Sequence, residues 1–342
     1  MLTARELNRA VLARQLLLRR ADVSVPAALE SICGVQDQYA PNGYIRLWSC
    51  VQDFAREDLT RALVRRSVVQ GTLMRGTIHL VSARDYPIFV AAIREFRREW
   101  ARGIHKQDDS DRSRAVARIR GRLRGRTVDR RDLGELAGGA SPAVLQTIDT
   151  DAELLRVPPS GTWEHRRAST LALASEWLGR TPKMSARAAL AHLVTRYLRA
   201  FGPAPAQDIA SFIGASPAHL RPVLASLGLR RFRDEPGREL LDLPGAPLPD
   251  ADTPAPVRFL PTWDALLLIH ARRTGVLDES YRKVIFRTTA PQSFPTFLVD
   301  GRVAGTWSYT EGRVRLEPFE RLGRAVRREL ADEGERLAAF HR

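Results

Sequence analysis

Two glutamines, Gln36 and Gln38, stand two residues apart in a segment that could carry chemistry. Residues at this spacing point to the same side of an extended chain, whereas on a helix they lie about 200° apart. Each carboxamide carries both donors and an acceptor, so a side-by-side pair could hold a water, a phosphate or the edge of a base. The alternative is an ordinary loop in which both glutamines face solvent or satisfy backbone groups, and spacing alone favours it.

The residues around the pair predict an extended backbone. A short helix is expected over residues 24–33, with Pro26 near its start and Gly34 where a helix C-terminus prefers glycine. Pro41 and Gly43 are expected to prevent a helix from resuming at once. The glutamines are therefore placed on a connecting segment between two helices.

Residues 1–107 have the element order of a winged helix-turn-helix, a fold that commonly docks on DNA. Capping patterns mark helix starts, and glycines among β-branched residues mark a hairpin. The expected elements are a helix opened by Thr3 and Glu6, helices at 24–33, 45–51 and 57–64, a hairpin at 69–81, and a long helix after Ser82.

Three basic side chains of this unit are candidate DNA contacts. Arg75 and His79 lie on the expected hairpin, from which they could reach a groove. Arg46 lies on the short helix that follows the glutamines. A hairpin whose basic residues face only solvent is equally compatible with the pattern.

Two further regions repeat the order of helices followed by a hairpin, without clear sequence self-similarity. Both are predicted to be winged units. Residues 108–183, which include a strongly basic stretch at 112–131, are expected to form strands at 154–157 and 162–164. Residues 184–243 are expected to form helices at 185–200 and 206–213, a helix after Ser216, and strands at 229–232 and 239–243.

A proline-rich linker over residues 244–256 precedes a region with a different sequence pattern. Residues 257–342 contain short strand-like runs, and Asp300-Gly301 between two of them is a strong hairpin signal. We expect a small β-barrel or sheet closed by an amphipathic helix. The chain is thus predicted to be α+β, mostly α, with three winged units before a small C-terminal β-barrel.

The charge of the chain points to a polyanionic partner. Its 342 residues carry a net charge of +15, and the only lysines are Lys106, Lys183 and Lys283. Arginine binds phosphate in a bidentate manner and stacks on bases, which suits nucleic acid. A coding bias toward arginine would explain the choice of residue but explains the net excess less well, so DNA is the expected partner.

The remaining features indicate a soluble cytoplasmic protein. Cys33 and Cys50 are the only cysteines and form no pairing pattern typical of secreted domains. The N-terminus has no signal-peptide core, and the longest apolar runs, such as residues 265–269, are far too short to span a membrane.

No pattern predicts a metal or another cofactor. The seven histidines show no ligand spacing, no glycine-rich phosphate loop follows a strand, and no acidic cluster suggests a two-metal nuclease. His270, near Trp263 and Asp264, is interpreted as a satisfied structural histidine. Pattern alone therefore leads to a DNA-binding protein of several winged helices, and leaves open whether it is a transcription regulator or an enzyme.

Five segments together resemble the AlkZ/YcaQ family of bacterial winged-helix DNA glycosylases, in the family's order and over nearly the whole chain. They are VQDQYAP (35–41), MRGTIHLV (74–81), RAFGP (199–203), LPTWD (260–264) and PTFLVDGRVAGTW (295–307). The resemblance implies three tandem winged helices in a C-shape, followed by a C-terminal β-barrel.

The resemblance also implies a catalytic role for the glutamine pair. The family signature is glutamine, a hydrophobic residue, then glutamine or aspartate, and Gln36 and Gln38 match its outer positions. The Gln-Gln form resembles the AlkZ branch, whose members give self-resistance to producers of genotoxic antibiotics. Asp37 departs from the signature. Alternation predicts that it points away from the pair and bonds backbone; a twisted loop would instead let it supply a catalytic carboxylate.

By resemblance, the chain is expected to be a monofunctional DNA glycosylase that acts as a monomer, without a cofactor. Its expected substrate is double-stranded DNA carrying bulky or crosslinked N7-alkylguanine, of azinomycin or trioxacarcin type, and its product is abasic DNA for base excision repair. Such a base is cationic and leaves neutral, so the enzyme has to place a water and tolerate an oxocarbenium-like sugar. The alternative is a winged-helix transcription regulator without catalysis.

Overall fold

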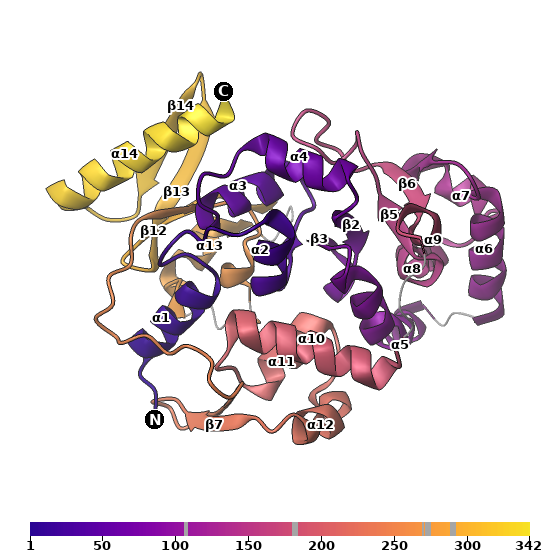
Figure 1. The fold of residues 1–342 in the computed structure, drawn as a ribbon, viewed down its shortest axis with the longest axis horizontal. Coiled ribbons are helices and arrows are strands. Elements are labelled where there is room, and N and C mark those ends of the chain that lie inside the picture. The colour runs from indigo at the N-terminus through magenta and orange to yellow at the C-terminus, as the bar shows by residue number, and fades with distance from the viewer. Residues whose placement is uncertain (106–108, 180–183, 269, 271–274, 288–291) are drawn as a thin grey trace.

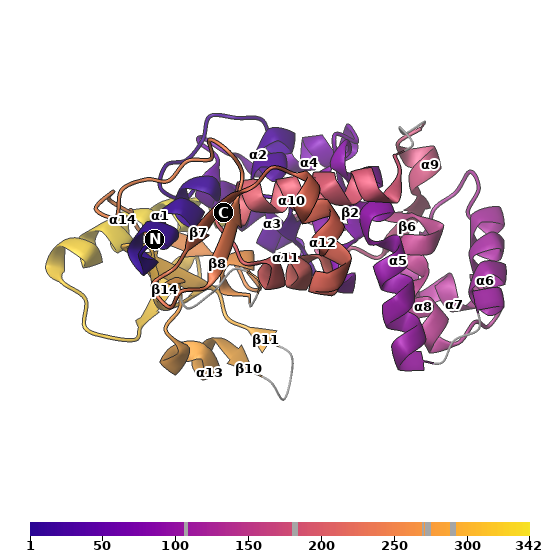
Figure 2. The ribbon, with the colours of Figure 1, turned by 90° about the horizontal axis from the view of Figure 1, so that it is seen from below.

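The computed structural model describes residues 1–105, 109–179, 184–268, 270, 275–287 and 292–342. It is an α+β structure in which helices predominate (Figures 1 and 2). The N-terminal region contains α1 (Ala4–Arg14), α2 (Val25–Ser31), β1 (Val35–Gln36), α3 (Pro41–Cys50), α4 (Arg56–Val64), β2 (Val68–Thr72), a 3₁₀ turn (Met74–Gly76), β3 (Ile78–Ser82) and α5 (Asp85–His105).

Local sequence explains where the first helices begin. The Thr3 hydroxyl accepts the Glu6 N–H at 3.2 Å while the Glu6 carboxylate accepts the Thr3 N–H at 2.7 Å, so the predicted capping box is confirmed. Ser82 caps α5 by accepting the Asp85 N–H at 3.1 Å. The expectation for the next helix was wrong: α3 begins at Pro41, because proline is well tolerated in the first turn, where its missing N–H is not needed.

The remaining elements follow the expected order of helices and short strands. The second region contains α6 (Asp109–Arg122), β4 (Val128–Asp129), α7 (Leu133–Leu136), α8 (Pro142–Ala152), β5 (Leu154–Arg156), β6 (Thr170–Leu173) and α9 (Ala174–Trp177). The third contains α10 (Ala186–Phe201), α11 (Ala206–Ile213), α12 (Pro217–Ser226), β7 (Arg230–Arg233) and β8 (Glu239–Asp242). In Figure 1, α10 lies between α1 and α5, both of which it contacts.

Strands of the first two regions pair in one six-stranded sheet. Its order is β1-β3-β2-β5-β6-β4, and β2 pairs with β5 so that Gln70 stands opposite Arg156. Pairing removes exposed edges that an isolated hairpin would leave. The expected return strand at 162–164 was wrong: Gly161 and Thr162 donate to the His165 carbonyl in a closed loop, and β6 pairs with β5 instead.

Apolar side chains of the described residues form two cores. The smaller lies within residues 115–173 and is built from α6, α7, α8 and neighbouring strands. The larger joins the N-terminal, third and C-terminal regions and also includes Leu155, Val157, Trp163, Ala172 and Ala174 of the second region. The second region therefore has a core of its own and connects to the rest largely through the shared sheet and α5.

The C-terminal region is an open sheet, so the expectation of a closed β-barrel was wrong. Strands β9 (Arg258–Leu260), β12 (Thr296–Val299), β13 (Arg302–Thr310) and β14 (Arg313–Pro318) pair in the order β14-β13-β12-β9, which leaves β14 and β9 as edges. Four short strands are too few to close a barrel. Helix α14 (Arg324–His341) packs against β14 (Figure 1). The other elements are α13 (Arg282–Ile285), β10 (Phe286–Arg287) and β11 (Gln292–Ser293).

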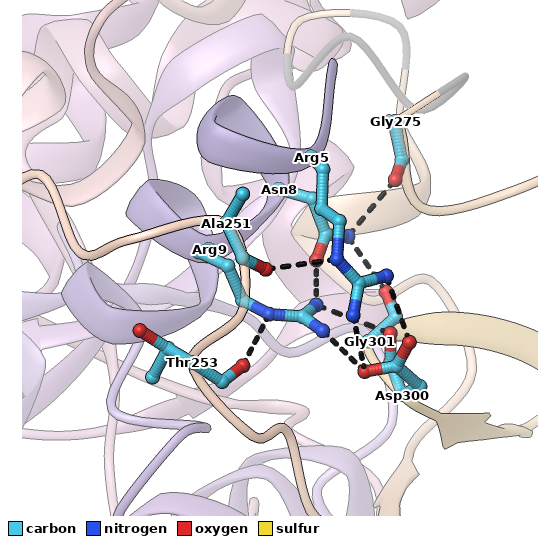
Figure 3. A network of polar contacts seen from close by, with 8 residues as sticks. All are labelled: Arg5, Asn8, Arg9, Ala251, Thr253, Gly275, Asp300 and Gly301. Carbon is cyan, nitrogen blue, oxygen red and sulfur yellow. Dashed lines mark hydrogen bonds and ion pairs between the residues drawn. The ribbon is translucent and has the colours of Figure 1, made fainter. Parts of the chain in front are cut away.

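The predicted Asp300-Gly301 hairpin turn is confirmed and is held by the N-terminal helix (Figure 3). Both residues have positive φ, 46° and 78°, as the favoured two-residue turn requires. The Asp300 carboxylate pairs with Arg5, at 2.9 Å, and with Arg9. Asn8 donates to the Gly301 carbonyl at 2.8 Å. Helix α1 of the N-terminal region is thus bonded to the β12–β13 turn of the C-terminal region.

In the described part of the chain, none of the helices has the length and apolar character needed to cross a membrane.

Candidate functional site

The two glutamines lie at the edge of the six-stranded sheet. Gln36 ends the edge strand β1 and stands directly opposite His79 of β3. The backbone enters β1 through a left-handed turn at Cys33 (φ 62°) and Gly34 (φ 79°). A Cβ at Gly34 would lie 2.9 Å from Cγ1 of Val81, so this approach of β1 to β3 requires glycine.

The side chains of Gln36 and Gln38 are in direct contact. Nε2 of Gln36 donates to Oε1 of Gln38 at 2.9 Å. Gln36 is only 8% exposed, whereas Gln38 is exposed. The pair therefore consists of one anchored amide and one accessible amide.

Arg75 supports the anchored amide from the hairpin tip. Its Nη2 donates to Oε1 of Gln36 at 2.9 Å, and its Nη1 donates to the Phe212 carbonyl of α11, also at 2.9 Å. Burial lowers the pKa of its guanidinium to about 10, which leaves it charged at neutral pH. In the described residues, no carboxylate forms an ion pair with Arg75. This placement differs from the exposed wing expected for a DNA contact, because two of its donors point inward.

The other two predicted DNA contacts are buried. His79 is 2% exposed, its Nδ1–H donates to the Thr77 carbonyl at 3.0 Å, and burial lowers its pKa to about 3. Arg46 pairs with Asp264 at 3.0 Å and donates to Oε1 of Gln15 at 2.8 Å. A phosphate contact requires an accessible charge, and in this structure neither side chain offers one.

Asp37 lies on the other side of the strand from the glutamine pair. Its carboxylate accepts hydrogen bonds from the Gly43 N–H at 2.9 Å and from Nε2 of Gln70 at 2.6 Å. Gln70 also donates to the Gly161 carbonyl at 3.0 Å, so it links the glutamine segment to the second region. The side chain is 1% exposed, and burial raises its pKa to about 8. The sequence left two roles open for Asp37: bonding the backbone away from the pair, or supplying a catalytic carboxylate. Its contacts with Gly43 and Gln70 fit the first role.

Replacing Gly43 by alanine should disturb this support. An added Cβ would lie 2.2 Å from Cδ1 of the buried Leu80 and 3.1 Å from Oδ1 of Asp37. We expect the variant to lose about 1–3 kcal/mol of unfolding free energy in urea denaturation, because a packed interior resists extra atoms. Gly121→Ala is the control: it lies in a helix with open space around it and should gain up to about 1 kcal/mol. A Gly43→Ala protein as stable as the parent would contradict the packing argument.

A loop of the second region borders the accessible glutamine. Arg166 donates through Nη1 to the hydroxyl of Tyr39 at 2.9 Å, and its carbonyl accepts the Ala40 N–H at 3.4 Å. Tyr39 is 45% exposed. The same loop lines a surface cavity of about 530 Å³. Sequence analysis missed Arg166 and Gln70, because nothing in the spacing of either residue connects it to the glutamines.

His270 lies behind the site in an aromatic environment formed by Tyr197, Phe201 and Phe212. The Tyr197 hydroxyl donates to its carbonyl. Neither ring nitrogen has a hydrogen-bond partner among the described residues, and burial lowers its pKa well below the usual value. His270 is therefore a buried residue whose ring contacts, in the described part of the chain, are aromatic side chains. Across the described ranges, no three potential metal ligands cluster.

The arrangement is thus a pair of uncharged amides supported by one charged donor, Arg75. Within the described chain, the recorded hydrogen-bond partners of the two glutamines are each other and Arg75, and none is a carboxylate. Such a site can bind donors and acceptors and orient a water, but the residues in contact with it supply no group that titrates near neutral pH.

Comparisons with known proteins give a family and a similar fold. The family model described as "DNA glycosylase AlkZ-like" matches residues 29–340. The solved structure of Streptomyces sahachiroi DNA glycosylase AlkZ matches with a TM-score of 0.81 at 21% identity, covering 99% of this chain and 96% of that chain. At that identity the likeness concerns the fold. No curated protein matches the sequence.

Proposed function

This chain belongs to the AlkZ-like family of DNA glycosylases, and from that premise we propose that it removes N7-alkylguanine from double-stranded DNA. The adducts are bulky or crosslinked products of a genotoxic natural compound, of azinomycin or trioxacarcin type. Hydrolysis of the N-glycosidic bond gives abasic DNA for base excision repair and protects the producing cell. A regulator without catalysis, left open by the sequence pattern, is set aside because the family consists of glycosylases.

The observation that supports this class of substrate is that the two glutamine side chains are uncharged. An N7-alkylated guanine is already cationic, so it leaves as a neutral base without needing protonation. An unalkylated purine leaves far less readily and would call for a general acid. The pair Gln36 and Gln38 offers oriented dipoles and no titrating group, which suits the first kind of leaving group.

We further propose how the protein meets DNA. The regions 1–107, 108–183 and 184–243 act as three winged helices arranged in a C-shape, with residues 244–256 as linker to the region 257–342. The net charge of +15 supports binding to the phosphate backbone. The protein acts as a monomer in the cytoplasm and needs no cofactor.

An excision assay tests the proposed function. Duplexes carrying a single N7-methylguanine, an azinomycin-type crosslink or a trioxacarcin-type adduct are incubated with excess enzyme, and abasic sites are scored as alkali-labile breaks. We expect breaks at the bulky adducts and none in unmodified duplex. Binding without any break at any adduct would reject the proposal for N7-alkylguanine while leaving the family assignment untouched.

A further inference from the structure

Hydrogen bonds run in one direction through the glutamine pair. Arginine can only donate, so the atom of Gln36 that faces Arg75 at 2.9 Å must be its oxygen. The Gln36 amide nitrogen is then the atom that faces Gln38, and the group it meets must be the Gln38 oxygen. The shape of an amide does not distinguish its nitrogen from its oxygen, but the chemistry of Arg75 does.

We propose that Arg75 is a positioning residue that sets the orientation of both amides in the pair. This inference rests on the proposed function for its consequence: one lone pair of the Gln38 oxygen is engaged by Gln36, so the directions of its second lone pair and of its NH₂ group are fixed where the lesion would bind. If Arg75 is exchanged for a residue that does not hold the Gln36 oxygen, both amides can rotate, and the accessible group at Gln38 is no longer defined.

The hairpin tip holds Arg75 in place for this role. Arg75 has a left-handed backbone (φ 56°), a costly conformation for a residue other than glycine. Its guanidinium also lies over the Phe212 ring, 5.2 Å from the ring centroid, and donates to the carbonyl of the same residue. The hairpin and α11 therefore fix the donor that faces Gln36.

The charge of Arg75 strengthens the arrangement. Charged donors form hydrogen bonds roughly twice as strong as neutral ones, and a bond to a carbonyl oxygen polarises the whole amide. The Gln36 N–H is thereby a better donor to Gln38. No carboxylate of the described chain forms an ion pair with Arg75, so its charged N–H groups donate to the carbonyl oxygens of Gln36 and Phe212 while the guanidinium lies over the Phe212 ring.

Gln36→Glu is the sharpest test, because it separates stability from orientation. The new carboxylate gains an ion pair with Arg75 but loses the N–H that holds Gln38. We expect the variant to unfold at a higher urea concentration than the parent, yet to excise as slowly as Gln36→Ala. Excision near the parental rate would overturn the inference, because the direction of the hydrogen bonds would then not matter. A midpoint below that of the parent would also overturn it.

A double-mutant cycle tests whether Arg75 acts through Gln36. Lysine keeps the charge but cannot donate in the same fork to both carbonyls. Arg75→Lys should slow single-turnover excision by about tenfold to a hundredfold in the parent. In the Gln36→Ala background the same change should alter the rate by no more than about twofold. An equal loss in both backgrounds would refute a role exerted through Gln36.

The competing account is a direct DNA contact by Arg75, as the sequence pattern indicates. It requires weaker binding of undamaged duplex by Arg75→Lys or Arg75→Met, and for the neutral variant a salt slope smaller by about 0.9. Our inference requires unchanged affinity and salt slope. Arg14→Lys is the matched control: Arg14 is buried and pairs with Asp242 at 2.7 Å, so its loss should lower stability and leave the excision rate unchanged.

Failure of the inference and failure of the proposed function are distinguishable. If the parent protein excises none of the adducts, the proposed function fails, while the orientation remains testable in the free protein. With glutamine-selective ¹⁵N labelling, the side-chain NH₂ signals of Gln36 and Gln38 should both shift in Arg75→Met, which has no donor for the Gln36 oxygen. Unshifted signals would reject the orientation whatever the activity.

Discussion

Replacing Gln38 by alanine is expected to lower the single-turnover excision rate by about a hundredfold to a thousandfold, or about 2.7–4 kcal/mol of transition-state free energy. Gln38 is the accessible member of the pair, so its amide is the group placed to meet the reacting nucleotide. Because its side chain is exposed, its loss removes no packing, and the unfolding free energy should change by less than about 0.5 kcal/mol.

The measurement is the formation of abasic sites under enzyme excess, alongside binding of the intact adduct duplex. Affinity should change little, because phosphate contacts dominate it. Gln52→Ala is the matched control, since Gln52 is also an exposed glutamine and its side chain donates to the neighbouring Asp53 at 3.4 Å. A Gln38→Ala enzyme within a few-fold of the parental rate would remove the accessible amide from the mechanism.

Replacing Asp37 by asparagine is expected to change both stability and its pH dependence. Gln70 donates the same nitrogen to Asp37 and to the Gly161 carbonyl. If the asparagine oxygen still accepts the Gly43 N–H, the asparagine NH₂ group faces Nε2 of Gln70, so two donors meet. Rotating the Gln70 amide would remove this conflict but would break its hydrogen bond to the Gly161 carbonyl. The conflict leaves a buried polar group unsatisfied, which costs about 1–3 kcal/mol.

The pH dependence follows from the raised pKa of Asp37. Burial raises it to about 8 in the folded protein, against about 3.9 for an unfolded aspartate. Between these values the folded state holds a proton that the unfolded state has released, so this group stabilises the fold below pH 4 and its contribution is lost as the pH rises toward 8. Asparagine lacks this titration, so the unfolding free energy of the parent minus that of Asp37→Asn should decrease steadily from pH 5 to pH 8.

Urea denaturation at pH 5, 6.5 and 8 measures this difference. Subtracting the unfolding free energy of the variant from that of the parent removes the contribution of Asp264, because both proteins contain it. Burial also raises the pKa of Asp264. Parallel pH profiles would show that Asp37 does not titrate in this window. The excision rate should fall only modestly, because Asp37 supports the glutamine segment and does not face the pair. A loss as large as in Gln38→Ala would instead make it a candidate general base.

Parts of the fold that depend on neighbouring residues could be predicted from the sequence. The capping box of Thr3 and Glu6 and the turn at Asp300-Gly301 involve residues three or fewer apart, and both appeared as expected. The hairpin that carries Arg75 is likewise local. In each case the backbone preference of a few side chains decides the conformation.

Other expectations failed because distant residues decided them. The strand expected at 162–164 is absent and β6 pairs with β5 instead, and the pairing of β2 with β5, with Gln70 opposite Arg156, was not expected. The C-terminal strands form an open sheet, because the edge strands β14 and β9 do not pair with each other. Sequence pattern contains no signal for which strands, dozens of residues apart, will pair.

The candidate site shows the same division. The sequence by itself determined that two amides lie two residues apart just beyond the helix that ends before Gly34, and it predicted an extended backbone, which the structure has as a strand at Val35–Gln36. It did not predict that the next helix begins at Pro41. Only the tertiary structure decided that Arg75 faces Gln36, that Asp37 faces Gln70, and that Arg46 and His79 are buried. The physical reason is that side-chain partners are selected by packing between elements, and that packing exists only once the sheet and α11 have assembled.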